Sequence, residues 1–232
     1  MSRLVQHTLE YLKDYYPRSS FDVWRKQTKG PPGFTARHAI GVVNLARLTG
    51  EDTLLPVALL TCCGLDEAIV RGCKREDGSR EQLSLEDIGL CFKAKGKLVE
   101  AAVAMCLRIC SWKKISPKCT NKPKTLFDLM ELGSSRKTRK RLDTSGIDEG
   151  DGCREALRNA TLDLPRRVSA LCSGRGGPNL LLNFENFYGD VRKQLCKECW
   201  AVVQDRDLAE RRVTWSRLPE LLGITVDRWG RS

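Results

Sequence analysis

The sequence predicts an all-α fold, an irregular bundle of roughly seven to nine helices with a disordered basic insertion. Three observations predict this class. Apolar residues recur at three- and four-residue steps along most of the chain. Aromatic residues make up only 6%, so leucine, valine and alanine must build the core, which favours helices over a β-sandwich. The composition, 41% hydrophobic and 30% charged, is globular, and we expect one helical domain over residues 1–232.

The N-terminal half shows clear helix boundaries. An apolar stripe over residues 4–12 stops before Pro17, and a short element follows at residues 21–24. A second helix is predicted over residues 35–48 with Gly50 as its stop, and Thr53 caps a buried helix that runs to Cys63. The segment Arg75–Ser79 is a turn. Ser84-Leu-Glu-Asp87 has capping-box spacing, so a helix should open near Leu85.

The C-terminal half alternates apolar helices with one segment of different composition. Further helices are expected over residues 98–110, 153–171, from about 184 to beyond 203, and as a short docking helix within 215–224. Residues 120–152 combine a basic run with glycine, serine and acidic residues, and we expect a flexible insertion there. The basic run consists of Arg136, Lys137, Arg139, Lys140 and Arg141.

That basic run has two interpretations. It fits a nuclear-import signal or a nucleic-acid contact, and the net charge of +11 favours acidic partners. It equally fits a solvated loop, since charge runs are usually solvated. No aromatic residues are interleaved with it, so a stacking platform for single strands is not expected.

The eleven cysteines do not form a disulfide framework, because their number is odd and their spacing irregular. We expect an intracellular protein, cytoplasmic or nuclear, with reduced thiols and no membrane span or secretory signal. Five thiols in apolar runs are predicted to be small core residues: Cys62, Cys63, Cys91, Cys106 and Cys110.

The late pair Cys196-Lys-Glu-Cys199 has the spacing with which two thiolates bind one tetrahedral zinc ion. Cys119 and Cys153 lie in polar sequence and are the best candidates for the other two ligands. Two alternatives remain open. A helical apolar stripe also runs through Cys199, which fits core packing without metal, and a redox pair would need a thioredoxin-like βαβ setting.

Several segments together resemble a known family. They are Asn44–Asp52, Leu55–Cys63, Leu83–Cys91, Cys196–Cys199 and Trp215–Gly223. The combination is similar to the region that follows the BTB/POZ fold in BTB-domain proteins of mushroom-forming fungi, and the likeness covers nearly the whole chain apart from residues 125–152. The BTB fold itself, which would supply dimerisation or docking to a ubiquitin-ligase scaffold, is expected to be absent from this chain.

The sequence offers no catalytic constellation, and we do not expect an enzyme. With only two histidines, His7 and His38, both in amphipathic segments, histidine-based catalysis is nearly excluded. The leading hypothesis is a non-catalytic protein–protein interaction module with one structural zinc ion. The alternative is a nuclear, nucleic-acid-associated regulator that uses residues 136–141. A third hypothesis, an enzyme that uses a Cys196 or Cys199 thiolate, requires a reactive cysteine of low pKa.

Overall fold

The computed structural model describes residues 3–16, 20–26, 31–113, 115–121, 152–167, 180–181 and 185–230. Within these residues the protein is all-α, as predicted, and the one sheet is an antiparallel hairpin of β1 (Cys73–Lys74) and β2 (Arg80–Glu81). The described helices outnumber the roughly seven to nine expected, because short helices such as α5 (Ala68–Arg71) are separate elements.

The chain divides into two compact units. Unit 1 comprises Met1–Met105, Pro165–Leu182 and Leu208–Ser232, and unit 2 comprises Cys106–Leu164 and Asn183–Asp207. The single domain over residues 1–232 stays a prediction.

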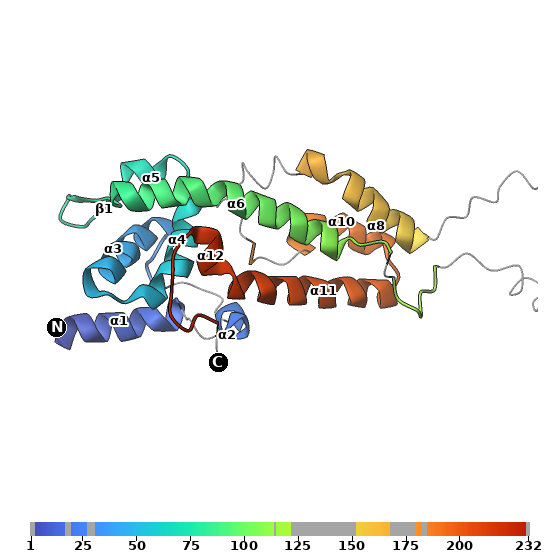
Figure 1. Ribbon diagram of the computed structural model, residues 1–232, viewed down its shortest axis with the longest axis horizontal. Helices are drawn as coiled ribbons and strands as arrows, with labels where there is room; N and C mark the ends of the chain where they lie inside the picture. The colour runs from blue at the N-terminus through green and yellow to red at the C-terminus, as the bar shows by residue number, and fades with distance from the viewer. Residues whose placement is uncertain are drawn as a thin grey trace, which may run out of the picture. The chain divides into compact units, whose positions relative to one another are not determined.

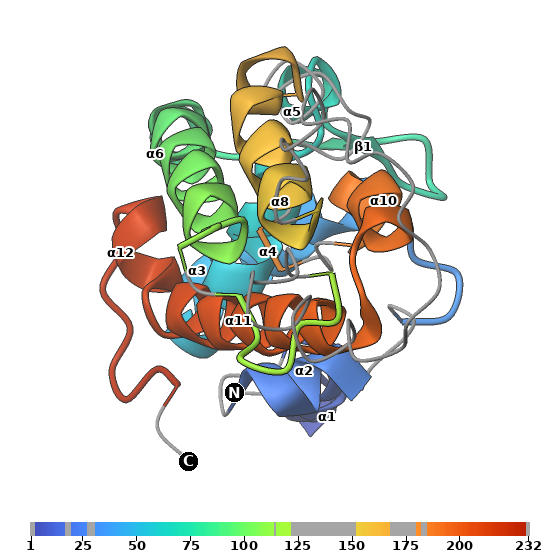
Figure 2. The same cartoon turned by 90° about the vertical axis from the view of Figure 1, so that its right-hand side faces the viewer.

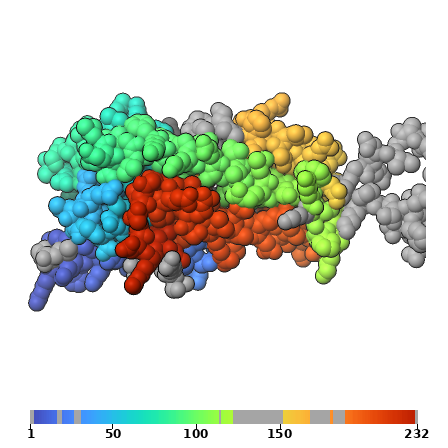
Figure 3. All heavy atoms as spheres, in the orientation of Figure 1, coloured from blue at the N-terminus to red at the C-terminus, as the bar shows by residue number. Residues whose placement is uncertain are grey.

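Unit 1 is built around α4 (Leu55–Cys63), in which every residue except Thr61 is buried. This confirms the predicted buried helix, although its N-cap is Leu54 and not Thr53, which lies within the short 3-10 helix Asp52–Leu54. The helix lies against α3 (Ala39–Thr49) and α12 (Leu218–Leu222) (Figure 1). The space-filling view shows the red atoms of the C-terminal segment directly against the blue helices of this unit (Figure 3).

The predicted end of one further helix and the predicted start of another are confirmed, whereas the helix expected from residue 35 begins at Ala39. Gly50 ends α3 in the left-handed region with φ 72°, which glycine adopts without steric cost. Ser84 opens α6 (Leu85–Ile109): the Asp87 amide donates to Ser84 Oγ at 3.1 Å, and the Ser84 hydroxyl donates to Asp87 Oδ2 at 3.2 Å. The expected helix over 98–110 is the second half of α6, because no residue between them breaks the helix.

The remaining elements of unit 1 include α1 (Arg3–Tyr15), α2 (Phe21–Lys26), η1 (Ala36–His38) and η2 (Asp52–Leu54). The aromatic rings of Phe21, Trp24 and Trp215 pack together with centroids 5.8–6.3 Å apart. Trp229 stacks on Trp215 at 4.9 Å and donates its indole N–H to the Trp215 carbonyl at 2.6 Å. The expected docking helix is α12. It lies in sequence between Trp215 and Trp229, which contact each other.

Unit 2 contains the end of α6, α8 (Gly152–Leu162), α10 (Glu185–Gln194) and the first part of α11 (Lys197–Ser216). Helices α8 and α10 lie side by side (Figure 2). The helix expected over 153–171 is interrupted at Asp163: α8 ends at Leu162, residues 164–167 are again helical, and residues 168–171 lie outside the described part. Of the expected insertion, residues 122–151 also lie outside it.

The long helix expected from about residue 184 to beyond 203 is interrupted between Gln194 and Lys197. The apolar periodicity of the sequence continues through this point, but the helical backbone is broken here. The Cys196 amide donates to Cys153 Sγ at 3.2 Å instead of to a carbonyl of the preceding turn. The interruption therefore places Cys196 at the start of a new helix.

Candidate metal centre and groove

Three segments of unit 2 each bring cysteines to one point. Cys119 lies in the turn after α6, where its amide donates to the Ser116 carbonyl at 3.1 Å. Cys153 lies in the first turn of α8. Cys196 precedes α11 and Cys199 lies in its first turn, and the Trp200 amide donates to the Cys196 carbonyl at 2.9 Å, which makes Cys196 the helix cap.

The sulfur atoms of Cys119, Cys153, Cys196 and Cys199 all lie within 4.8 Å of one another. The Sγ atoms of Cys119 and Cys196 are 3.9 Å apart. A tetrahedral zinc ion with Zn–S bonds of about 2.3 Å separates its sulfur ligands by about 3.8 Å. The cluster is thus sized for one metal ion, and it consists of the four residues that the sequence predicted. It is the one such group among the described residues.

Hydrogen-bond donors surround these sulfurs. Besides the Cys196 amide on Cys153, the Ser116 amide donates to Cys199 Sγ. The Cys199 amide and both the amide and the hydroxyl of Thr120 donate to Cys196 Sγ. A neutral thiol is a weak acceptor, whereas a thiolate is stabilised by such donors. The surroundings therefore fit metal-binding thiolates better than core thiols.

The thiol pKa values differ across the cluster for physical reasons. Burial raises the pKa of Cys153 to about 11 and also raises the pKa of Cys199, and neighbouring sulfurs add to both shifts. Burial opposes ionisation of Cys196 as well, but the donors from Cys199 and Thr120 prevail and lower its pKa to about 6. Without metal, the Cys196 thiol is therefore ionised at neutral pH.

Apolar side chains pack against the cluster, and the guanidinium of Arg206 lies near it. Cys119, Cys153 and Cys199 are buried, Cys196 is partly exposed, and Ile115 and Leu195 pack against them. Arg206 donates to the carbonyls of Ile109 at 3.3 Å and Ser111 at 2.9 Å. Burial lowers the Arg206 pKa, and the charge of a Cys199 thiolate acts against that shift. Four thiolates around a divalent ion carry net negative charge, which this guanidinium helps to offset.

Two further groups of residues were predicted from the sequence, the basic run and the core thiols. The basic residues 136–141 lie outside the described part of the chain. The five predicted core thiols are confirmed as buried, with exposed fractions of 4% or less: Cys62, Cys63, Cys91, Cys106 and Cys110.

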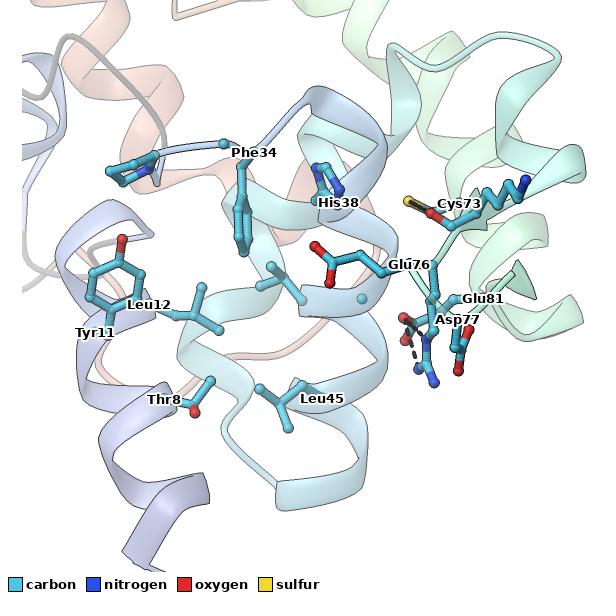
Figure 4. Close-up of a pocket in the computed structure, with 16 residues that line it drawn as sticks. Thr8, Tyr11, Leu12, Phe34, His38, Leu45, Cys73, Glu76, Asp77 and Glu81 are labelled. Atoms are coloured by element: carbon cyan, nitrogen blue, oxygen red, sulfur yellow. Dashed lines mark hydrogen bonds and ion pairs between the residues drawn. The ribbon is translucent and has the colours of Figure 1, made fainter. Parts of the chain in front are cut away.

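Unit 1 carries a groove of ≈ 790 Å³ that the sequence did not reveal. Its floor is apolar, with Leu12 of α1 and Leu45 of α3, and Phe34 points into it from above (Figure 4). The β1–β2 hairpin forms the opposite wall with Glu76 and Glu81 (Figure 4). The groove combines α1, α3 and the hairpin, which are distant in sequence. Both helices and the turn at residues 75–79 were predicted, but the strand pairing and the approach of the three elements were not.

Three polar groups in this groove differ in their partners. Glu81 accepts hydrogen bonds from Asn44 at 3.1 Å and pairs with Arg75 at 2.9 Å, so its charge is already matched. Glu76 extends into the groove (Figure 4), and within the described residues it makes no hydrogen bond or ion pair. His38 accepts the Thr35 amide on Nδ1 at 2.7 Å, so neutral His38 carries its hydrogen on Nε2.

Comparisons with known proteins return no match: no family model, no curated protein and no solved structure is similar to this chain. Across the part of the chain that the structure describes, no helix is both long and apolar enough to cross a lipid bilayer.

Proposed function

We propose that this protein is a non-catalytic protein-binding module in which one structural zinc ion holds unit 2 together. The observation that carries the proposal is the convergence of four cysteine sulfurs within 4.8 Å. Four protein ligands complete the tetrahedral shell of zinc and leave no position for water or substrate, which is the arrangement of structural sites. A sulfur-only tetrahedral set suits zinc or iron, and metal analysis separates the two.

The core of unit 2 supports a need for such an ion. Among the described residues of unit 2, the buried side chains are mostly small, including Cys110, Ala156 and Ala160, with few large ones such as Ile109 and Leu157. A small core of this kind contributes little hydrophobic stabilisation. A metal that joins the segments of Cys119, Cys153 and Cys196–Cys199 adds its binding free energy to folding, because the four ligands come together only in the folded chain.

The groove of unit 1 supports a role in binding protein segments. Its apolar floor takes one or two apolar side chains, and the carboxylate of Glu76 is available to pair with a cation. The partner that fits is a peptide segment in which an apolar residue lies close to a lysine or arginine. The resemblance to the region after the BTB/POZ fold agrees with an interaction role.

The binding role is tested by selecting peptides from a random displayed library on the full chain. Wild type should enrich sequences with an apolar residue near a basic one, and Glu76→Arg should abolish that enrichment. Glu100→Arg, at an exposed glutamate of α6 outside the groove, is the matched control and should retain it. No enrichment on wild type, or equal enrichment on Glu76→Arg, would contradict the proposal.

The alternative of a nucleic-acid-associated regulator makes a different prediction. Duplex DNA should then bind wild type at low salt, weaken steeply as salt rises, and lose binding when residues 136–141 are replaced by alanine. Its support is the net charge of +11.

A further inference from the structure

When four cysteines bind one metal ion, all four sulfurs are thiolates, so access to solvent decides which one meets an oxidant first. Of the described cysteines, only Cys196 is partly exposed, and the others are buried. The exposed residue Thr120 donates hydrogen bonds to its sulfur, so this side of the cluster faces solvent-exposed chain. The cluster therefore has one sulfur that a small molecule in solution can reach.

The sulfur of Cys196 also has a second thiolate beside it. Cys119 Sγ lies 3.9 Å away, and a disulfide bond requires a separation of about 2.05 Å. The two residues belong to different segments, since Cys119 lies in the turn at residues 116–119 and Cys196 caps α11. The turn that carries Cys119 belongs to neither α8 nor α11, so the two sulfurs can approach by movement of that turn.

We propose that Cys196 is the site at which peroxides modify this protein, and that oxidation joins Cys196 to Cys119 and releases the metal. The inference rests on the proposed zinc site and adds its regulation by a chemical class of oxidant.

The reaction proceeds in two balanced steps. The Cys196 thiolate attacks one peroxide oxygen, so an S–O bond forms, the O–O bond breaks, and hydroxide leaves. The Cys119 thiolate then attacks the resulting sulfenic sulfur, so the S–S bond forms, the S–O bond breaks, and a second hydroxide leaves. Two thiolates lose two electrons and the peroxide gains them. Cys153 and Cys199 alone then remain as ligands, and zinc is released.

The test uses the full-length protein with its zinc content measured beforehand. Equimolar hydrogen peroxide is added, zinc release is followed with a chromogenic chelator, and disulfide-linked peptides are identified by mass spectrometry. We expect stoichiometric release together with a Cys119–Cys196 linked peptide. A dominant Cys196–Cys199 link, first oxidation at another cysteine, or retained zinc would overturn the inference.

A matched pair of variants separates the role of Cys196 from loss of a ligand. Cys196→His and Cys153→His both leave three sulfurs and one nitrogen for zinc, but only the first removes the exposed sulfur. Peroxide should release zinc from Cys196→His at least about tenfold more slowly than from Cys153→His. If either variant binds no zinc, the peptide mapping of wild type decides the question.

The two proposals fail in distinguishable ways. Wild-type protein that contains no metal contradicts the zinc site itself. Zinc-loaded protein that resists peroxide contradicts only the inference about Cys196.

Discussion

Cys199 and Cys110 are two thiols of unit 2 with the same exposed fraction, 1%, but different surroundings. Cys199 belongs to the four-sulfur cluster, whereas Cys110 packs at the end of α6. Cys199→Ala should lose zinc and unfold at a much lower temperature. Cys110→Ala should keep zinc and cost about 1 kcal/mol, the loss of a small buried group. Metal analysis and thermal unfolding of both variants check this, and equal losses would argue for simple packing.

The thiol pKa values predict how zinc affinity depends on pH. Cys153 has a pKa of about 11 without metal and Cys199 is also raised, so both are protonated at pH 7.5 and must release protons on binding. Cys196, with its pKa lowered to about 6, is already ionised at pH 7.5. Protons compete with zinc for this sulfur only when the pH falls to about 6 or lower. Zinc affinity should therefore rise with pH between 6 and 9.

Calorimetric titration of metal-free protein in two buffers of different ionisation enthalpy measures the protons released. The release should include at least those of Cys153 and Cys199. An affinity that does not change over this pH range would contradict the assignment of these thiols as ligands.

At the scale of elements, the hairpin depends on one glycine. Gly72 has φ +75°, and a Cβ atom there would lie 2.4 Å from the Glu81 carbonyl oxygen, in the facing strand β2. Gly72→Ala should therefore destabilise the protein by roughly 2–4 kcal/mol and distort the wall that carries Glu76.

The control for this change is Gly89→Ala, because Gly89 lies within α6 with open space around its Cα. That substitution should stabilise the protein by about 0.5–1 kcal/mol. Urea unfolding of the two variants gives the comparison. A Gly72→Ala protein as stable as wild type would show that the close approach to Glu81 imposes no constraint.

Sequence patterns predicted most helices because apolar periodicity, capping residues and helix-ending glycines are local signals. Gly50 and Ser84 are confirmed at the positions where they were expected. The interruption before Cys196 was not predicted, since it arises from a hydrogen bond to Cys153, 43 residues earlier in the chain. The sequence patterns predicted the helix that starts near Leu85 and the apolar pattern over 98–110 as two helices. They form the single helix α6, because the sequence near Leu98 contains no signal that ends one helix and starts another.

At the scale of the whole molecule, the two candidate sites differ in how far the sequence revealed them. Cys119 and Cys153 were found because thiols in polar sequence are unusual as core residues. The groove left no such signal, because its residues belong to α1, α3 and the hairpin and each resembles an ordinary surface or core position. Sites made of rare residue types are visible in sequence, whereas sites made of shape are not.

Removal of metal should affect the two units unequally. With a zinc chelator, amide hydrogen exchange should accelerate in α8, α10 and the first turn of α11, whose positions depend on the cluster. Helix α4 should keep its protection, because its buried apolar residues supply its stability without metal. Uniform acceleration, or none, would show that the cluster does not hold unit 2 specifically.

The most direct test of the zinc centre is the metal content, by mass spectrometry, of protein purified without chelator, beside the double variant Cys196→Ser/Cys199→Ser. About one zinc per chain is expected in wild type, and its loss in the variant should come with reduced thermal stability. A metal-free wild type that unfolds at the same temperature as the variant would contradict a structural zinc site and leave the four cysteines as packing residues.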